Sequence, residues 1–147
     1  MNTQTIDIDG FEIEIASELY CDGGGGAYAW RSLLQTGVHL PLSSDFPGET
    51  LNPFYGIYAA ITRQDPQGDP PGGWYSEQRL TLEEALRGYT VEAAYAEFEE
   101  QAKGSIEPGK LADFIVISGN ITSLPAKEIL NDPRAQNIRR REVGLRR

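Results

Sequence analysis

Residues 27–43 read AYAWRSLLQTGVHLPLS and place a helix pattern and a strand pattern on either side of one glycine. Apolar side chains recur at helical spacing in the first part: Ala27, Trp30, Leu33 and Leu34. Gly37 stands where a helix C-cap belongs, and an apolar run begins at once at residue 38. A helix, a glycine and a strand in this order are typical of an α/β unit, so the sequence predicts an α/β fold.

The predicted strand ends at a carboxylate, because Ser43 and Ser44 lead into Asp45 and then into a Phe46-Pro47-Gly48 turn. A charge at the end of a buried strand must be paired or hydrogen-bonded. The C-terminal ends of parallel strands are where α/β folds place catalytic groups. An Asp before Pro-Gly also commonly caps the following turn through backbone N–H groups. Position alone leaves both interpretations of Asp45 open, a catalytic one and a structural one.

His39 is the only histidine of the chain and the natural candidate for a partner to Asp45. In an extended strand the two side chains point the same way, but six residues separate them by about 20 Å. They therefore cannot share a metal ion within one subunit. A hydrolytic zinc site normally needs three protein ligands. The chain has one Cys and contains no H-x-H, H-E-x-x-H or C-x-x-C pattern, so we expect it to bind no metal alone.

The remaining segments carry clear local signals. Asn52 and Pro53 open a predicted helix that reaches about residue 63, with Asn52 as the cap. The TLEE sequence at 81–84 is a capping box; the helix it opens is predicted to reach about Thr90, and a second short helix to reach Phe98. Between these, residues 65–73 form a Pro/Gly-rich loop. The apolar run at 114–117 predicts a strand buried on both faces.

Composition limits the class of protein. A chain of 147 residues with 39% hydrophobic residues fits one globular domain, and a net charge of -9 argues against a general nucleic-acid binder. The last fourteen residues are nevertheless basic, which favours a solvated tail and leaves a nucleic-acid or partner contact as the alternative. One Cys, no secretory signal and no long apolar stretch predict a cytoplasmic location away from membranes.

Four stretches, in this order, carry a resemblance to a known family: GAYAWRSLLQTGV, LSSDFPGETLNPFYGIYAAITRQDPQG, PPGGWYSEQRLTLEEALRGYTVEAAYAEFEE and KGSIEPGKLADFIVIS. Together they resemble the C-terminal part of amidohydrolase family 3, the deformylase-like metal-dependent hydrolases of the amidohydrolase superfamily. The resemblance implies a (β/α)₈ metal barrel with a β-sandwich composite domain, of which this chain holds an incomplete barrel. It also implies hydrolysis of non-peptide C–N bonds in small amides, formamides or cyclic ureas, with a divalent, zinc-type metal.

In this resemblance Asp45 matches the strand-8 aspartate, which lies beside the metal as general base. Asp45 is therefore the candidate catalytic residue, and a metal ligand only if another chain supplies the rest. Phe46, Pro47 and Trp74 are the candidate substrate-proximal residues. The family's histidine ligands from earlier strands have no counterpart here, and a complete barrel takes about 250 residues. The chain alone is accordingly predicted to be inactive.

The predicted organisation has four parts. Residues 1–25 hold an alternating strand or hairpin and a Gly-rich linker without a family counterpart, and 26–103 are the C-terminal barrel segment. Residues 104–130 are the composite-domain strand region, and 131–147 a basic tail. Two alternatives to a hydrolase fragment stay open: a non-catalytic module that forms homo-oligomers or docks on a partner, and half of a split metal site that another chain completes.

Overall fold

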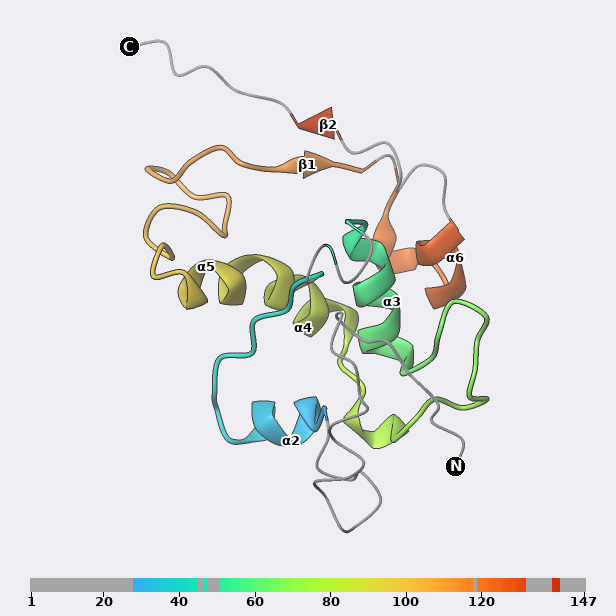
Figure 1. Ribbon diagram of the computed structural model, residues 1–147. Helices are drawn as coiled ribbons and strands as arrows, with labels where there is room; N and C mark the ends of the chain where they lie inside the picture. The colour runs from blue at the N-terminus through green and yellow to red at the C-terminus, as the bar shows by residue number, and fades with distance from the viewer. Residues whose placement is uncertain (1–27, 45–46, 48–50, 118, 132–138, 141–147) are drawn as a thin grey trace.

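The computed structural model describes residues 28–44, 47, 51–117, 119–131 and 139–140, and these ranges consist mainly of short helices and loops (Figure 1). The helices are α2 (Trp30–Gln35), α3 (Pro53–Thr62), α4 (Leu82–Arg87), α5 (Ala93–Ala96) and α6 (Ala126–Asn131). The strands are β1 (Ile115–Val116) and β2 (Arg139–Arg140), which form one antiparallel pair. None of the helices described is long and apolar enough to cross a membrane.

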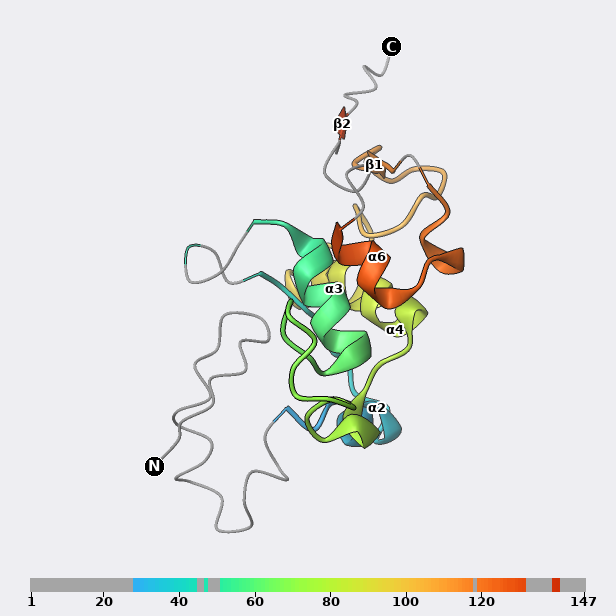
Figure 2. The same cartoon turned by 90° about the vertical axis from the view of Figure 1, so that its right-hand side faces the viewer.

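Helix α3 is the central element, and α4 and α6 both pack against it (Figure 2). Its start is the one predicted: Asn52 Oδ1 accepts the backbone N–H of Phe54 at 3.1 Å, and Pro53 takes the first helical position, where it needs no N–H partner. Phe54 and Ile57 are buried in the core, together with other α3 residues. The core therefore forms around α3, against which α4 and α6 pack.

The capping box of α4 is also confirmed. The Thr81 hydroxyl accepts the Glu84 N–H at 3.2 Å, and the Glu84 carboxylate accepts the Thr81 N–H at 2.6 Å. The two predicted helices are present as α4 and α5, but the turn that joins them was not expected. A π turn, Gly88–Glu92, joins α4 to α5 without a break, because no residue between them stops the helix.

The predicted strand at 38–43 does not form, since residues 38–44 have no regular structure. An apolar run becomes a strand only when a neighbouring strand offers its N–H and C=O groups. Here the Leu42 N–H donates instead to the Gly88 carbonyl in the π turn, at 3.0 Å. Leu42 is still buried and Leu40 packs against the core, so the segment contributes to the core without forming a sheet.

The predicted strand at 114–117 forms in part. Only Ile115–Val116 is a strand, and its partner is Arg139–Arg140 of the basic tail, in the register Ile115 with Arg140. Ile115 is 47% exposed, so the prediction of burial on both faces was wrong. A two-stranded pair has no further layer to cover it. The alternating stretch at 5–16 and the glycine run at 23–26 lie outside the described residues, and the (β/α)₈ architecture is not visible in the described ranges.

Candidate functional site

Asp45 and Phe46 lie outside the described residues, whereas the chain on both sides of them is described. Pro47 occupies an exposed turn position. On the earlier side, Ser43 ends the segment that the π turn holds, and on the later side Asn52 caps α3. In the sequence, the candidate aspartate therefore lies between two well-anchored points of the helical core, Ser43 and Asn52.

Trp74 lies at the other end of α3. Its backbone N–H donates to the Arg63 carbonyl at 2.8 Å, and the Arg63 Nε donates to the Trp74 carbonyl at 2.9 Å. Arg63 is the C-cap of α3, so about 15 Å of helix separates this pair from the Asn52 end. Trp74 is only partly buried and packs edge-on against Tyr28 and Tyr75. The structure thus places Trp74 in a cluster around Arg63, at the end of α3 remote from Asn52.

Arg63 is the most unusual polar residue of the core. Its side chain is fully buried, with the guanidinium carbon 4.8 Å from the Trp30 ring centre and 4.7 Å from that of Trp74. Its Nη1 donates to the Tyr28 carbonyl at 3.1 Å, but its Nη2 has no hydrogen-bond partner in the described part of the chain. Burial lowers the pKa of Arg63 to about 10, and the charge of Glu77 offsets only part of this effect. It remains a cation at neutral pH, held by carbonyls and aromatic faces.

His39 contacts Glu92, whereas the sequence suggested Asp45 as its candidate partner. Its Nδ1 lies 2.5 Å from Glu92 Oε2, and its ring stacks on Tyr95 with the ring centres 3.6 Å apart. Glu92 also accepts from Arg87 Nη2 at 2.8 Å. Burial raises the pKa of Glu92, but the hydrogen bonds from His39 and Arg87 outweigh it, and the net pKa is lowered. His39 is therefore tied to the helix beneath it.

The described residues do not fit a catalytic metal. No group of three or more His, Cys, Asp and Glu side chains with metal-binding geometry occurs among them. His39 and Glu92 offer two donors, and the imidazole nitrogen nearest Glu92 is already engaged with that carboxylate. Because a hydrolytic metal needs three protein ligands, these ranges do not supply a complete site.

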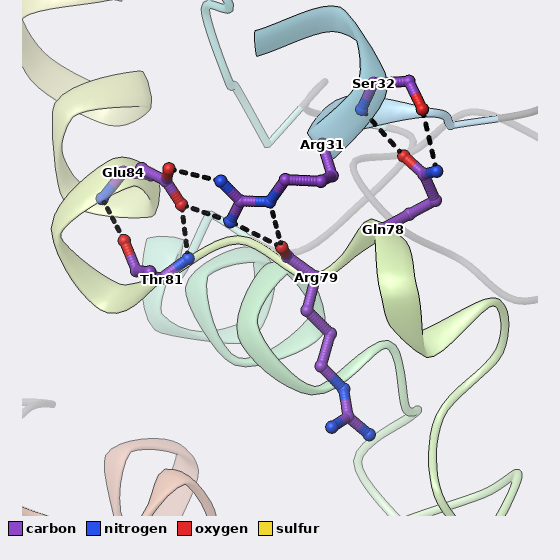
Figure 3. Close-up of polar contacts among 6 residues, drawn as sticks. All are labelled: Arg31, Ser32, Gln78, Arg79, Thr81 and Glu84. Atoms are coloured by element: carbon purple, nitrogen blue, oxygen red, sulfur yellow. Dashed lines mark hydrogen bonds and ion pairs between the residues drawn. The ribbon is translucent and has the colours of Figure 1, made fainter. Parts of the chain in front are cut away.

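A second polar network fixes α2 against α4 (Figure 3). Arg31 donates from Nη1 and Nη2 to the two oxygens of Glu84, both at 2.6 Å, and from Nη2 to the Arg79 carbonyl at 2.8 Å. Beside it, Gln78 and Ser32 bond reciprocally: Ser32 N–H to Gln78 Oε1 at 3.1 Å, and Gln78 Nε2 to Ser32 Oγ at 2.9 Å. Mainly through the bonds from Arg31, the pKa of Glu84 falls to about 2. The side-chain groups in this network bond to one another, so its role is structural.

Sequence reasoning missed both the Arg63 cluster and the Arg31–Glu84 pair. Each joins residues far apart in the chain, and an isolated Arg gives no sign of its partner. One local signal did exist for Arg63: the Pro/Gly-rich loop at 65–73 begins just after it, so the chain must turn sharply at the end of α3. Arg63 is itself in the left-handed region, with φ 61°.

Comparison with known proteins identifies the class. The family model described as "Amidohydrolase family" matches residues 12–140, which is most of the chain, so this chain belongs to the amidohydrolase family. The match takes in more of both ends than the four quoted stretches. It includes residues 12–25, so the expectation that the first 25 residues have no family counterpart was wrong for these. No solved structure matches the chain.

Among curated proteins, the chain is similar to the protein LONG AFTER FAR-RED 3 of Arabidopsis thaliana, with 38% identity over 94 residues. It is 37% identical over 87 residues to an N-substituted formamide deformylase of Arthrobacter pascens. It is also 39% identical over 85 residues to an imidazolonepropionase of Acinetobacter baumannii. The matches cover 64%, 59% and 58% of this chain, but only 16%, 16% and 18% of those relatives. The chain thus spans less than a fifth of the length of each.

Proposed function

We propose that this chain is the C-terminal segment of an amidohydrolase-family hydrolase that cleaves non-peptide C–N bonds, and that Asp45 is its catalytic contribution. The observation that carries the proposal is the family match across residues 12–140. The 147 residues alone are proposed to be inactive. The support is the donor set: one His and one Cys in the sequence, and no three-ligand cluster in the described ranges.

The proposed substrate is a small amide, formamide or cyclic urea. Two relatives support this class by name: one is a deformylase of N-substituted formamides, the other an imidazolonepropionase. In the complete site Asp45 accepts a proton from the attacking water and delivers it to the departing nitrogen. A carboxylate is suited to both steps, since it changes protonation state at little cost. The metal ligands of such a site come from outside the described residues.

The proposed parts of the chain keep the bounds expected from the sequence: 26–103 as barrel segment, 104–130 as composite-domain region and 131–147 as basic tail. The continuous packing of α3, α4 and α6 supports treating most of the first part as one unit. The pairing of β1 with β2 ties the second part to the tail. Phe46, Pro47 and Trp74 remain proposed substrate-proximal residues; the remote position of Trp74 at the C-terminal end of α3 makes it the weakest of the three.

A metal-loading assay tests the proposal. The purified 147-residue chain is titrated with zinc or iron and offered N-formyl and hydantoin-type substrates. We expect no turnover beyond the buffer rate. Turnover that a chelator abolishes would contradict the inactivity of the chain. In the active enzyme that contains this segment, Asp45→Asn is expected to lower kcat by at least about a hundredfold, the usual scale for general acid–base catalysis. Unchanged kcat there would contradict the role of Asp45.

A second function has one observation in its favour. Several large apolar side chains are exposed, with Phe98 92% and Ile106 87% exposed. Exposed apolar surface favours self-association or docking on a partner chain. A self-associating or docking module of this kind needs no catalytic activity. The exposed apolar surface is equally compatible with half of a split metal site that another chain completes. The mass of the purified chain in solution distinguishes a self-associating module from a monomer.

A further inference from the structure

We propose that Gly88 and Tyr89, at the start of the π turn, are positioning residues for the segment that leads into Asp45. The inference rests on the proposed function of Asp45. Its structural basis lies entirely in described residues, in the contacts between segment 39–43 and the helical run 87–95.

Four contacts hold this segment along one side of the helix. At its beginning, His39 bonds to Glu92 and stacks on Tyr95. Further along, the Leu42 N–H donates to the Gly88 carbonyl. From His39 to Leu42 the contacts advance along the segment and recede along the helix, so the two run antiparallel over this stretch. A segment with no sheet partner is thus kept in one place by a helix.

The last contact lies two residues before Asp45. The Tyr89 hydroxyl donates to the Ser43 carbonyl at 3.3 Å. The described segment is therefore held at Ser43, two residues before Asp45 in the sequence. Holding the chain close to a catalytic group is a general way to limit the orientations that the group loses when a substrate binds.

Gly88 makes the close approach possible. A Cβ at this position would lie 2.7 Å from Leu42 Cγ and 2.8 Å from Leu42 Cδ1, inside the limit for real contacts. It would also lie 3.3 Å from the Leu40 carbonyl oxygen. Gly88 is buried and has ordinary helical dihedrals, so this glycine is explained by space and not by backbone strain.

The π turn itself coincides with this contact. Single π turns inside helices are uncommon and occur frequently at functional sites. Here the turn begins at the residue whose carbonyl accepts from Leu42 and ends at the residue that binds His39. The π turn is therefore the surface on which segment 39–43 is held.

The first test uses the 147-residue chain and needs no activity. Because the chain has one histidine, its imidazole protons give a single set of NMR signals, shifted by the stacked Tyr95 ring. In Gly88→Val we expect that shift to collapse toward the free value and Leu42 amide exchange to rise about tenfold. In Tyr89→Phe we expect a rise of about threefold, since one hydrogen bond is lost.

Two controls separate positioning from unfolding. The Leu80 amide, which donates to Ala60 in the core at 3.0 Å, should keep its exchange rate in both variants. Tyr55→Phe removes a hydroxyl from a partly exposed tyrosine of α3 and should leave Leu42 exchange unchanged. Unchanged Leu42 exchange in both Gly88→Val and Tyr89→Phe overturns the proposal. If Gly88→Val unfolds the chain, Tyr89→Phe decides alone.

The second test measures catalysis in the active enzyme with an N-substituted formamide. We expect Tyr89→Phe to lower kcat about three- to tenfold with KM unchanged, and to have no further effect in an Asp45→Asn background. Equal effects in both backgrounds overturn the positioning role. If Asp45→Asn leaves kcat unchanged, the proposed function fails, whereas the NMR result still decides whether the π turn holds the segment.

Discussion

The Glu84 carboxylate binds both terminal nitrogens of Arg31, each at 2.6 Å, and at the same time accepts the backbone N–H of Thr81. One side chain therefore closes the N-terminus of α4 and attaches α2 to it. These two roles explain why α2 and α4 keep a fixed relation to each other. The pair also gives the clearest stability predictions.

Glu84→Gln is expected to destabilise the chain by about 1–2 kcal/mol at pH 7, because it removes a charge-assisted pair that solvent partly screens. Both side chains are under a third exposed, which keeps the effect above that of an ordinary surface pair. Urea unfolding followed by circular dichroism measures it. Glu83→Gln, on the exposed side of α4, is the matched control and should cost little.

The same pair predicts a pH dependence. The pKa of Glu84 is about 2 in the folded chain against an ordinary value of 4.5, so its contribution is complete above 4.5. It is lost as the pH falls from 4.5 toward 2, since protonation then costs the folded state more than the unfolded state. The stability gap between the wild type and Glu84→Gln should therefore shrink between pH 5 and about 2.5. A gap that stays constant across this range would refute the assignment.

Thr81→Ala should destabilise the chain by about 1 kcal/mol, because the N–H of Glu84 loses its capping oxygen. Thr81→Ser keeps the oxygen and should restore most of the loss. Thermal unfolding of the three proteins at neutral pH gives the comparison. The capping role is wrong if the serine and alanine variants unfold at the same temperature.

Arg63→Lys is expected to be more damaging than Arg63→Met. The planar guanidinium fits between two indole rings and reaches two carbonyls, whereas an ammonium is compact and strongly hydrated and would be buried without a carboxylate. We expect a loss of about 3 kcal/mol for lysine and about half of that for methionine. Urea unfolding with tryptophan fluorescence reports both, because Trp30 and Trp74 flank the site. Equal stability of Arg63→Lys and the wild type would contradict this.

The docking alternative predicts self-association through the exposed apolar residues after α5. Phe98→Ser combined with Ile106→Ser should move the purified chain toward the monomer mass in size exclusion with light scattering, because both side chains lie almost wholly in solvent. Leu51→Ser, at a 69% exposed position before α3, is the control and should leave the mass unchanged. A wild-type chain that is already monomeric at high concentration argues against this alternative.

Local sequence signals determined several parts of this protein. Asn52 with Pro53, and Thr81 with Glu84, fix where α3 and α4 begin, because a cap acts within four residues of itself. The helical spacing that starts at Ala27 predicted α2. The four quoted stretches, in their order along the chain, indicated the family, and the comparison confirms it. The role of Asp45 remains a prediction, since that residue lies outside the described part of the chain.

The tertiary structure alone decided the rest. The sequence at 38–43 has the pattern of a strand, yet it forms none. A strand needs a neighbouring strand to pair with, and here the Leu42 N–H bonds instead to the Gly88 carbonyl in the π turn. An arginine is usually exposed, yet Arg63 is buried between Trp30 and Trp74, which are not its neighbours in the sequence. Caps depend on near neighbours and are written in the sequence, whereas burial and partner choice depend on residues that only folding brings together.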